Sequence, residues 1–275
     1  MIELPEAVNL AGQLRENASG KEINDVVVGQ SPHKYAFYAE PDQYGLLLKG
    51  EKIEGVQSSG GYVEILVEGE VSILFGDGAR ILLHYDRAAL PGKHQLLIEF
   101  TDGSLISATV QAYAMLYCQE RAKIDNKYYL ISRAKPSPLT DEFNTSYFTN
   151  LVNESKANLS AKAFLATEQR IPGLGNGVLQ DILFKAKIHP RTKLESLTEK
   201  QRGALFTSLK KVLKKMTEMG GRDTERDLFG NQGGYRTLMC KNTVGSECPV
   251  CGTVIVKEAY LGGSVYYCPR CQPLQ

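Results

Sequence analysis

The sequence predicts an α+β protein in which a β-rich N-terminal lobe precedes a helical lobe and a small metal-binding module. Three observations carry this prediction. Short β-rich runs punctuated by Gly, Asp and Pro fill residues 22–133, apolar residues recur at helical spacing from about residue 160, and four cysteines cluster in 248–271. With 275 residues, the chain is long enough for one or two domains with an ordinary core.

The first half begins with a predicted helix over 5–18, in which Pro5 lies at or near the first turn. The β-rich runs that follow alternate partly, as in "GYVEILVEGEVSILF", and are separated by "FGDGA", "ALPGK" and "FTDGS". This pattern is typical of a β-sandwich or a β-barrel. The predicted strands cover 22–29, 62–67, 71–75, 80–85, 95–100, 104–110 and 127–133.

The second half follows a linker with two prolines, "AKPSPLTDEF" (134–143). A short amphipathic helix is predicted at "KAFLATEQR", and another begins in "NGVLQDILFKAKIHP" and is closed by Pro190. Thr198 is expected to cap a longer helix, which runs to about Met219 and ends at a Gly-Gly pair. The predicted domains are 1–134, 135–240 and 241–275.

Charge is unevenly distributed along the chain. Residues 156–275 contain 19 Lys and Arg and 10 Asp and Glu, a net charge of +9, whereas residues 1–155 hold the remaining 13 and 21, a net charge of −8. This asymmetry predicts that a polyanion contacts mainly the second half, although two domains that merely differ in charge would look the same. The sequence has no run of 18 apolar residues and no signal-peptide pattern, so we expect a cytoplasmic protein without a membrane span.

The C-terminal module carries two C-x2-C motifs, "CPVC" and "CPRC", separated by sixteen residues. Two such knuckles supply the four thiolates of a tetrahedral structural site, so we expect one Zn²⁺ per chain. The predicted ligands are Cys248, Cys251, Cys268 and Cys271. Two disulfides are the alternative, which the absence of an export pattern disfavours. The segment between the motifs predicts a hairpin that turns at Gly262–Gly263 and depends on the metal to fold, while Cys118 and Cys240 are expected to be packed thiols.

The Gly-rich stretch "RIPGLGNGVLQDILF" predicts a phosphate-binding turn. Gly173 and Gly175 allow a backbone to approach a ligand closely, and Asn176 lies where a helix begins. The side chain of Asn176 and the free N–H groups of that first turn are therefore expected to face DNA phosphate. An asparagine N-cap without a ligand is the alternative.

Four segments together resemble the formamidopyrimidine-DNA glycosylase and endonuclease VIII family. They are "ELPE" (3–6), "IPGLGNGVLQDILFKAKIHP" (171–190), "GGRDTERDLFGNQGGY" (220–235) and the finger ending "CPRCQ". The resemblance implies a monomer with a β-sandwich lobe, a helix–two-turn–helix lobe and a zinc finger, with damaged or abasic duplex DNA in the cleft between the lobes. It also implies that an oxidised base is flipped out and removed through a Schiff base on an N-terminal proline amine, followed by β-elimination.

The resemblance assigns roles to the first acids of the chain. Glu3 would handle protons at the sugar C1′ and ring oxygen, and Glu6 would support the same pocket. The alternative is that both are acids at the start of a helix, stabilised there by its macrodipole.

The family's nucleophile is missing from this sequence. Position 2 is Ile rather than Pro, and because Ile is bulky, Met1 is expected to remain and to displace the amine by roughly 3.8 Å. Lys34 in "SPHKYAF" is a candidate replacement, since a buried lysine with a lowered pKa forms Schiff bases; a solvated loop lysine is the alternative.

Three further departures concern DNA contacts. The family's β-lobe lysine is replaced by Gly61, and the finger arginine that grips phosphate aligns with Gly263. Where the family fills the gap left by a flipped base, "TVQAYAML" offers only Tyr113 and Met115.

Two functions therefore compete. The chain is a base-excision DNA glycosylase of altered chemistry, in which Glu3 activates water, or a non-catalytic reader of abasic or distorted DNA. An RNA-binding relative is the third possibility, which the expected cleft and helix–two-turn–helix disfavour.

Overall fold

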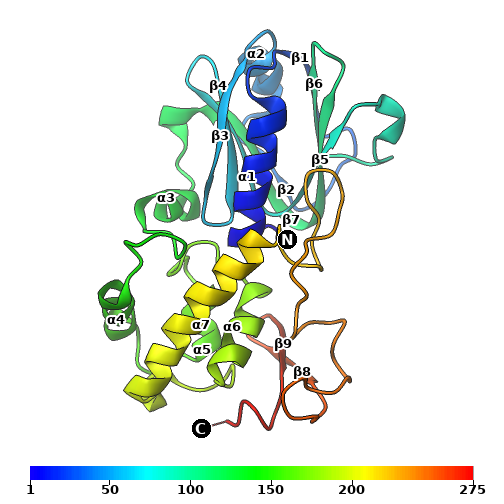
Figure 1. Cartoon of the computed structure of the whole chain (residues 1–275). Helices are drawn as coiled ribbons and strands as arrows, with labels where there is room; N and C mark the ends of the chain where they lie inside the picture. Colours follow the sequence, from blue (N-terminus) through cyan, green and yellow to red (C-terminus); the bar gives the residue numbers. More distant parts are fainter. Residues whose placement is uncertain (275) are drawn as a thin grey trace.

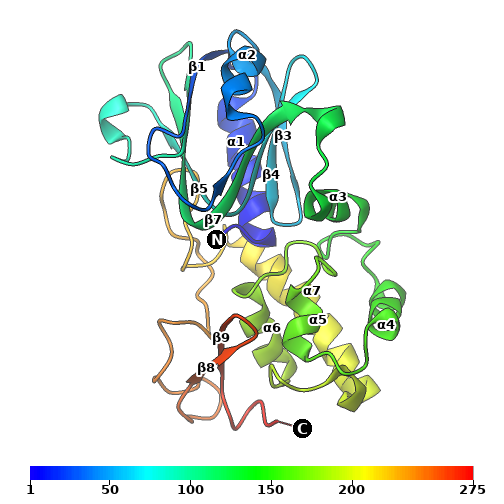
Figure 2. The same cartoon turned by 180° about the vertical axis from the view of Figure 1, so that it is seen from behind.

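The computed structural model describes residues 1–274 and contains a sheet lobe, a helical lobe below it and a C-terminal hairpin beside the helices (Figure 1). The N-terminus lies at the junction of the two lobes in both views (Figures 1 and 2). This arrangement confirms the predicted α+β architecture with the sheet lobe first. The sheet lobe contains α1 (Leu4–Ala18), β1 (Ile23–Val28), β2 (Ala36–Phe37), α2 (Tyr44–Leu48), β3 (Ile53–Ser59), β4 (Tyr62–Val67), β5 (Val71–His84), β6 (Leu96–Phe100) and β7 (Leu105–Glu120).

One seven-stranded sheet runs through the first lobe in the order β1-β6-β7-β5-β4-β3, with β2 added in parallel to β7. The two runs predicted at 71–75 and 80–85 are a single strand, β5, which continues through a bulge between Asp77 and Ala79. The run predicted at 104–110 extends to Glu120, because β7 pairs along the whole of β5. Strand β3 was not predicted, since "IEGVQSS" alternates too weakly to stand out.

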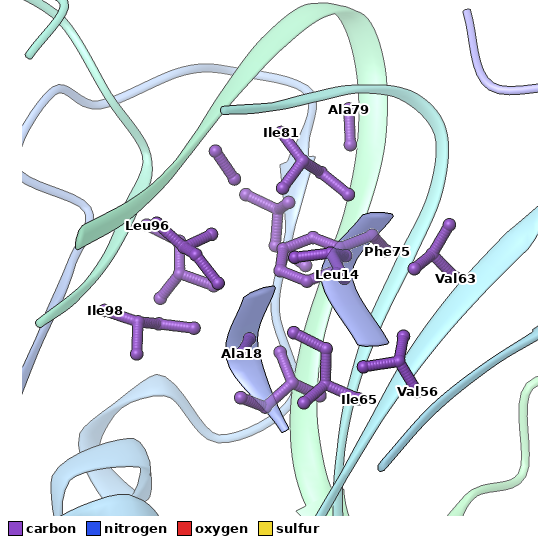
Figure 3. Packing of buried hydrophobic residues seen from close by; sticks show 14 of the residues in the cluster. Leu14, Ala18, Val56, Val63, Ile65, Phe75, Ala79, Ile81, Leu96 and Ile98 are labelled. Carbon is purple, nitrogen blue, oxygen red and sulfur yellow. The ribbon is translucent and has the colours of Figure 1, made fainter. Parts of the chain in front are cut away.

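Helix α1 fills the concave side of this sheet. Leu14 and Ala18 of α1 lie between Leu96 and Ile98 of β6 on one side and Val56, Val63 and Ile65 of β3 and β4 on the other (Figure 3). Both ends of the sheet therefore share one core, and burial of these apolar side chains against α1 provides most of the stability of the lobe. The core position of α1 fixes the residues immediately before it, which form the candidate site.

The helical lobe has its own core. Its elements are α4 (Thr145–Glu154), α5 (Ala161–Ala166), α6 (Val178–Ala186) and α7 (Glu199–Glu218), whereas α3 (Lys127–Ala134) packs on the sheet lobe through Tyr129. Thr198 caps α7 through a capping box with Gln201, as the sequence predicts. The strand predicted at 127–133 is wrong, because Asn126 caps a helix there by accepting from the N–H of Tyr129.

The C-terminal hairpin pairs β8 (Val256–Tyr260) with β9 (Gly263–Tyr267). Its turn consists of Leu261 and Gly262, both with positive φ (47° and 70°), one residue earlier than predicted. Gln180 of α6 accepts a 3.1 Å hydrogen bond from the N–H of Tyr266, so the hairpin is joined to the helical lobe. Among the helices of residues 1–274, none combines the length and the apolar character that a membrane span requires.

Candidate active site and metal centre

The N-terminal segment joins the two lobes. The N–H of Ile2 donates to the carbonyl of Asp77 in β5 at 2.6 Å, and the N–H of Leu4 donates to the carbonyl of Gly173 at 2.9 Å. The side chain of Ile2 is buried in the core of the sheet lobe. Because Pro5 restricts the backbone at the start of α1, the segment is held rigidly between the lobes.

Glu3 lies at the N-terminus of α6, 174 residues away in the sequence. Its carboxylate accepts from the N–H of Gly177 at 2.8 Å and from the N–H of Val178 at 2.7 Å. A Cβ on Gly175 would lie 2.6 Å from Oε1 of Glu3, so glycine is required there for the carboxylate to approach. Glu3 therefore occupies the helix end that was expected to face DNA phosphate, which corrects that part of the sequence prediction.

Arg222 completes this buried cluster, and sequence reasoning missed it. Its Nε and Nη2 donate to the two carboxylate oxygens of Glu6 at 3.0 and 2.8 Å, and its Nη1 lies 3.6 Å from Glu3. All three side chains are almost completely buried, with exposures of 3% for Glu3, 5% for Glu6 and 2% for Arg222. The only sequence signal was an arginine directly after the Gly-Gly pair that ends α7.

Opposing effects act on the pKa of the Glu3 carboxyl. Burial raises the pKa of the Glu3 carboxyl, while the positive charge of Arg222 and the two backbone N–H groups act to lower it. The net direction is a raised pKa. The carboxyl is thus moved toward the pH range in which it can both take up and release a proton.

Met1 lies beside Glu6 and also lines a larger hollow next to Glu3. Its amino group forms an ion pair with Glu225, and Nη2 of Arg222 donates to the carbonyl of Met1 at 3.3 Å. The nitrogen of Ile2 is consequently an amide that is already hydrogen-bonded to Asp77. The small space beside Glu6 measures about 20 Å³, room for roughly one water molecule.

A larger hollow, which we call the interlobe cavity, opens on the other side of Glu3. It measures about 410 Å³ and is lined by Glu3, Gly61, Lys162, Asn176 and Gly263, among others. The Nδ2 of Asn176 donates to the carbonyl of Ser264 at 2.9 Å, and Oδ1 is buried without a partner. Asn176 therefore does not cap α6 and joins it to β9 instead, so the N-cap alternative is wrong.

Lys162 is a second residue that the sequence did not single out. Its ammonium group donates to the carbonyl of Tyr260 and ends 3.4 Å from the point where a Cβ of Gly263 would lie. Burial lowers the pKa of Lys162. This lysine supplies a cation at the place where the family resemblance puts the finger arginine.

Other candidates are placed differently by the structure. Gly173 has a φ of 76°, and a Cβ there would lie 2.6 Å from the backbone of Gly60, so its role is close packing of the two lobes. A Cβ on Gly61 would lie 3.2 Å from the carbonyl of Ile2, which leaves little room for a side chain. Lys34 is exposed, lies over the ring of Tyr35 and does not line the interlobe cavity.

The four predicted zinc ligands converge at the end of the hairpin. The four Sγ atoms all lie within 4.8 Å of one another, with separations of 3.8 Å for Cys248–Cys271 and 3.4 Å for Cys251–Cys268. Zn–S bonds of about 2.3 Å in a tetrahedron require S···S separations of roughly 3.8 Å, so the site fits Zn²⁺. Four thiolates leave no open coordination position, and the zinc is structural. Cys118 and Cys240 are buried free thiols.

Comparisons with known proteins agree with this geometry. The family model described as "Formamidopyrimidine-DNA glycosylase H2TH domain" matches residues 135–227, and "Zinc finger found in FPG and IleRS" matches 245–274. The chain is 28% identical to the formamidopyrimidine-DNA glycosylase of Bacillus cereus over 280 residues, which covers 99% of both proteins. That of Listeria innocua is 28% identical over 284 residues, covering 99% of this chain and 100% of the relative.

Solved structures with the same fold include MutM (Fpg) of Thermus thermophilus, with a TM-score of 0.82, 23% identity and 99% coverage of both chains. Wild-type Lactococcus lactis Fpg (MutM) in complex with DNA containing an oxidized pyrimidine gives a TM-score of 0.84 at 25% identity, covering 98% of this chain and 99% of that one. The chain therefore carries the H2TH domain and the zinc finger of the formamidopyrimidine-DNA glycosylase family, and it is similar to formamidopyrimidine-DNA glycosylases over nearly its whole length.

Proposed function

We propose that this protein is a base-excision-repair DNA glycosylase that binds damaged duplex DNA over the interlobe cavity, with the damaged nucleotide in the cavity, and uses Glu3, without a terminal amine, for its chemistry. The observation that carries the proposal is the position of Glu3, buried at the wall of a cavity that Asn176 and Lys162 also line. The Lactococcus lactis relative has been solved with abasic and with oxidized DNA, which supports the same class of ligand. We also propose that it acts as a monomer on DNA in the cytoplasm.

Glu3 would act on water rather than on an amine. Each of its carboxylate oxygens accepts one backbone N–H and keeps a second lone pair. A water held there would give its proton to Glu3 as its oxygen bonds to C1′, while the bond from C1′ to the base breaks and the departing base takes up a proton. Asn176, through its second Nδ2 proton, and Lys162 would hold the flanking phosphates.

A second function is favoured by one specific observation. The amine of Met1 is ion-paired with Glu225, and the nitrogen of Ile2 is an amide that donates to Asp77. A protein that reads abasic or distorted DNA without excising a base would need no nucleophile. Release of free base from duplexes carrying oxidised bases separates the two functions, since only a glycosylase gives it.

The terminal amine is expected to take no part in catalysis. Borohydride trapping on abasic DNA should give no cross-link at Ile2, because its nitrogen is an amide that donates to Asp77. The matched gain-of-function variant is Ile2→Pro, in which removal of Met1 would expose a secondary amine at that position. Mass spectrometry of the intact protein reports whether Met1 is present. An efficient wild-type cross-link at Ile2 would contradict the proposal, and one at Lys34 would identify a relocated nucleophile.

DNA binding is expected to depend on salt and on Asn176. Affinity should fall steeply as salt rises, because phosphate contacts release counterions. Asn176→Ala should weaken binding by about 1–2 kcal/mol, the value of a hydrogen bond to a charged group. Fluorescence anisotropy with an abasic duplex measures both effects. The control is Asn153→Ala, an exposed asparagine of α4; equal affinity of the two variants, or a flat salt response, would argue against phosphate contacts at Asn176.

A further inference from the structure

A second hollow adjoins the interlobe cavity, and five aromatic rings line it. We call it the aromatic cavity; it measures about 400 Å³. Its rings are those of Phe37, Tyr62, Tyr113, Tyr117 and Tyr128. They come from β2, β4, β7 and α3, so the fold gathers them from four separate segments. None of them belongs to the cluster around Glu3.

The wall of the aromatic cavity is rigid where it meets the sheet. The ring of Tyr62 lies against Gly76, where a Cβ would come within 2.8 Å of it. On another side Tyr62 makes an edge contact with Tyr129, at a centroid distance of 5.7 Å and an interplanar angle of 81°. The Tyr129 hydroxyl is in turn fixed by a 2.6 Å hydrogen bond to Glu64. The cavity is therefore formed before any ligand arrives.

The outer rings, by contrast, are unpacked. Phe37 is 48% exposed, Tyr113 50% and Tyr128 48%. Large exposed aromatic side chains that surround a hollow mark a binding site, because their faces gain little from contact with water. Rings of this kind stack on nucleobases in proteins that bind unpaired nucleic acid.

Polar groups at the rim match the edge of a base. The side chains of Asn126 and Gln169 line the aromatic cavity; their oxygens already accept from the N–H groups of Tyr129 and Gly173, and their amide N–H groups can donate to a base. Asp77 adds a carboxylate, and the carboxylate of Glu168 is ion-paired with Arg170. Three of these four, Asp77, Glu168 and Gln169, have left-handed backbones with φ of 48°, 61° and 46°. Non-glycine residues held in this region concentrate at ligand clamps and other functional sites.

The aromatic cavity is continuous with the proposed DNA site. Five residues line both hollows: Tyr62, Asp77, Tyr113, Ala166 and Gln169. The Asp77 carboxylate at its rim argues against phosphate as the occupant, while Lys162, the cation for phosphate, lies in the interlobe cavity. We propose that the aromatic cavity holds the unpaired nucleobase of a nucleotide next to the one bound beside Glu3. This inference rests on the proposed function and narrows its substrate to damage flanked by an unpaired base.

The test compares two duplexes that carry a tetrahydrofuran abasic analogue beside one unpaired nucleotide. In the first duplex the unpaired nucleotide has its base, and in the second the base is absent. The wild-type protein should bind the first roughly tenfold more tightly, the size of one stacking contact. In the Tyr128→Ala and Phe37→Ala variants, the ratio of the affinities for the two duplexes should fall toward one. The base then has lost a ring on which it stacks, so removing the base costs little more. Tyr85→Ala, which removes an exposed ring outside both cavities, should keep the full ratio.

The inference would be overturned if the wild-type protein bound the two duplexes equally well. It would also be overturned if the affinity ratio stayed tenfold in both Tyr128→Ala and Phe37→Ala. These results leave the proposed function standing as long as the abasic duplex still binds. Failure to bind any abasic duplex would instead contradict the proposed function itself.

Discussion

Replacing Cys268 by alanine is expected to abolish zinc binding and to unfold the finger, residues 245–274. Three thiolates cannot close a structural site, and zinc binding of about 10–16 kcal/mol is the folding free energy of such small modules. The hairpin has few apolar contacts of its own, since the cluster around Cys268 contains only Phe184, Met239 and Ile255 as buried apolar partners among the described residues. Metal analysis should find one zinc per wild-type chain and about none in the variant.

The loss should reach the DNA site through two contacts. Asn176 is held by the carbonyl of Ser264, and Tyr266 is held by Gln180 of α6. Without a folded hairpin, Asn176 and Lys162 lose their partners, so DNA affinity should fall together with zinc content. Cys240→Ala is the matched control, because Cys240 is also a buried thiol but is not a ligand. A Cys268→Ala protein that keeps one zinc, or a folded wild-type protein without zinc, would refute the predicted site.

Replacing Arg222 by leucine is expected to destabilise the whole protein by about 3–5 kcal/mol at neutral pH. The change leaves Glu3 and Glu6 buried without their cation, and an uncompensated buried charge carries a penalty of this size. Arg222 also links the end of α7 to the start of α1 by donating its backbone N–H to Glu6. Equilibrium unfolding in denaturant measures the loss.

The pH dependence follows from Glu3, whose pKa burial already raises in the wild-type fold and which Arg222 acts to lower. Removing Arg222 raises that pKa further above the unfolded value near 4.3. An acid with a raised folded pKa destabilises the fold increasingly as the pH rises from the unfolded pKa to the folded pKa, and it has no effect once both states are protonated. The deficit of Arg222→Leu should therefore grow as the pH rises through the folded pKa of Glu3 and shrink as the pH falls toward 4.

Arg226→Leu provides the control from the same loop, because Arg226 is exposed and donates to the carbonyl of Gly230. Arg222→Lys keeps the positive charge but loses the bidentate hydrogen bonding to Glu6. The stability of this variant should therefore lie between those of the wild type and Arg222→Leu. Equal stability of Arg222→Leu and Arg226→Leu, or a deficit that does not change with pH, would show that the cluster is not a buried ion pair of this kind.

The sequence alone determined the features that short-range chemistry encodes. The spacing of the four cysteines predicts the zinc site, because two C-x2-C knuckles can meet one ion whatever surrounds them. Thr198 predicts the start of α7, and Pro5 predicts the start of α1, since caps act within one turn. That Met1 remains and displaces the amine stays a prediction from the bulk of Ile2.

Which distant groups meet depends on how the whole chain packs. Residues 127–133 are apolar and aromatic enough for a strand, yet the cap at Asn126 and the packing of Tyr129 on Tyr62 make them a helix. No local pattern shows that Glu3 ends at the N–H groups of Gly177 and Val178.

Arg222 and the aromatic cavity were hidden for the same reason. A lone arginine after two glycines, or single aromatic residues on four different elements, look like ordinary surface positions in a sequence. Their roles depend on burial and on long-range pairing, such as the contact of Arg222 with Glu6 across 216 residues. The free energy of these contacts arises when the whole chain packs, so no short stretch of it carries the signal.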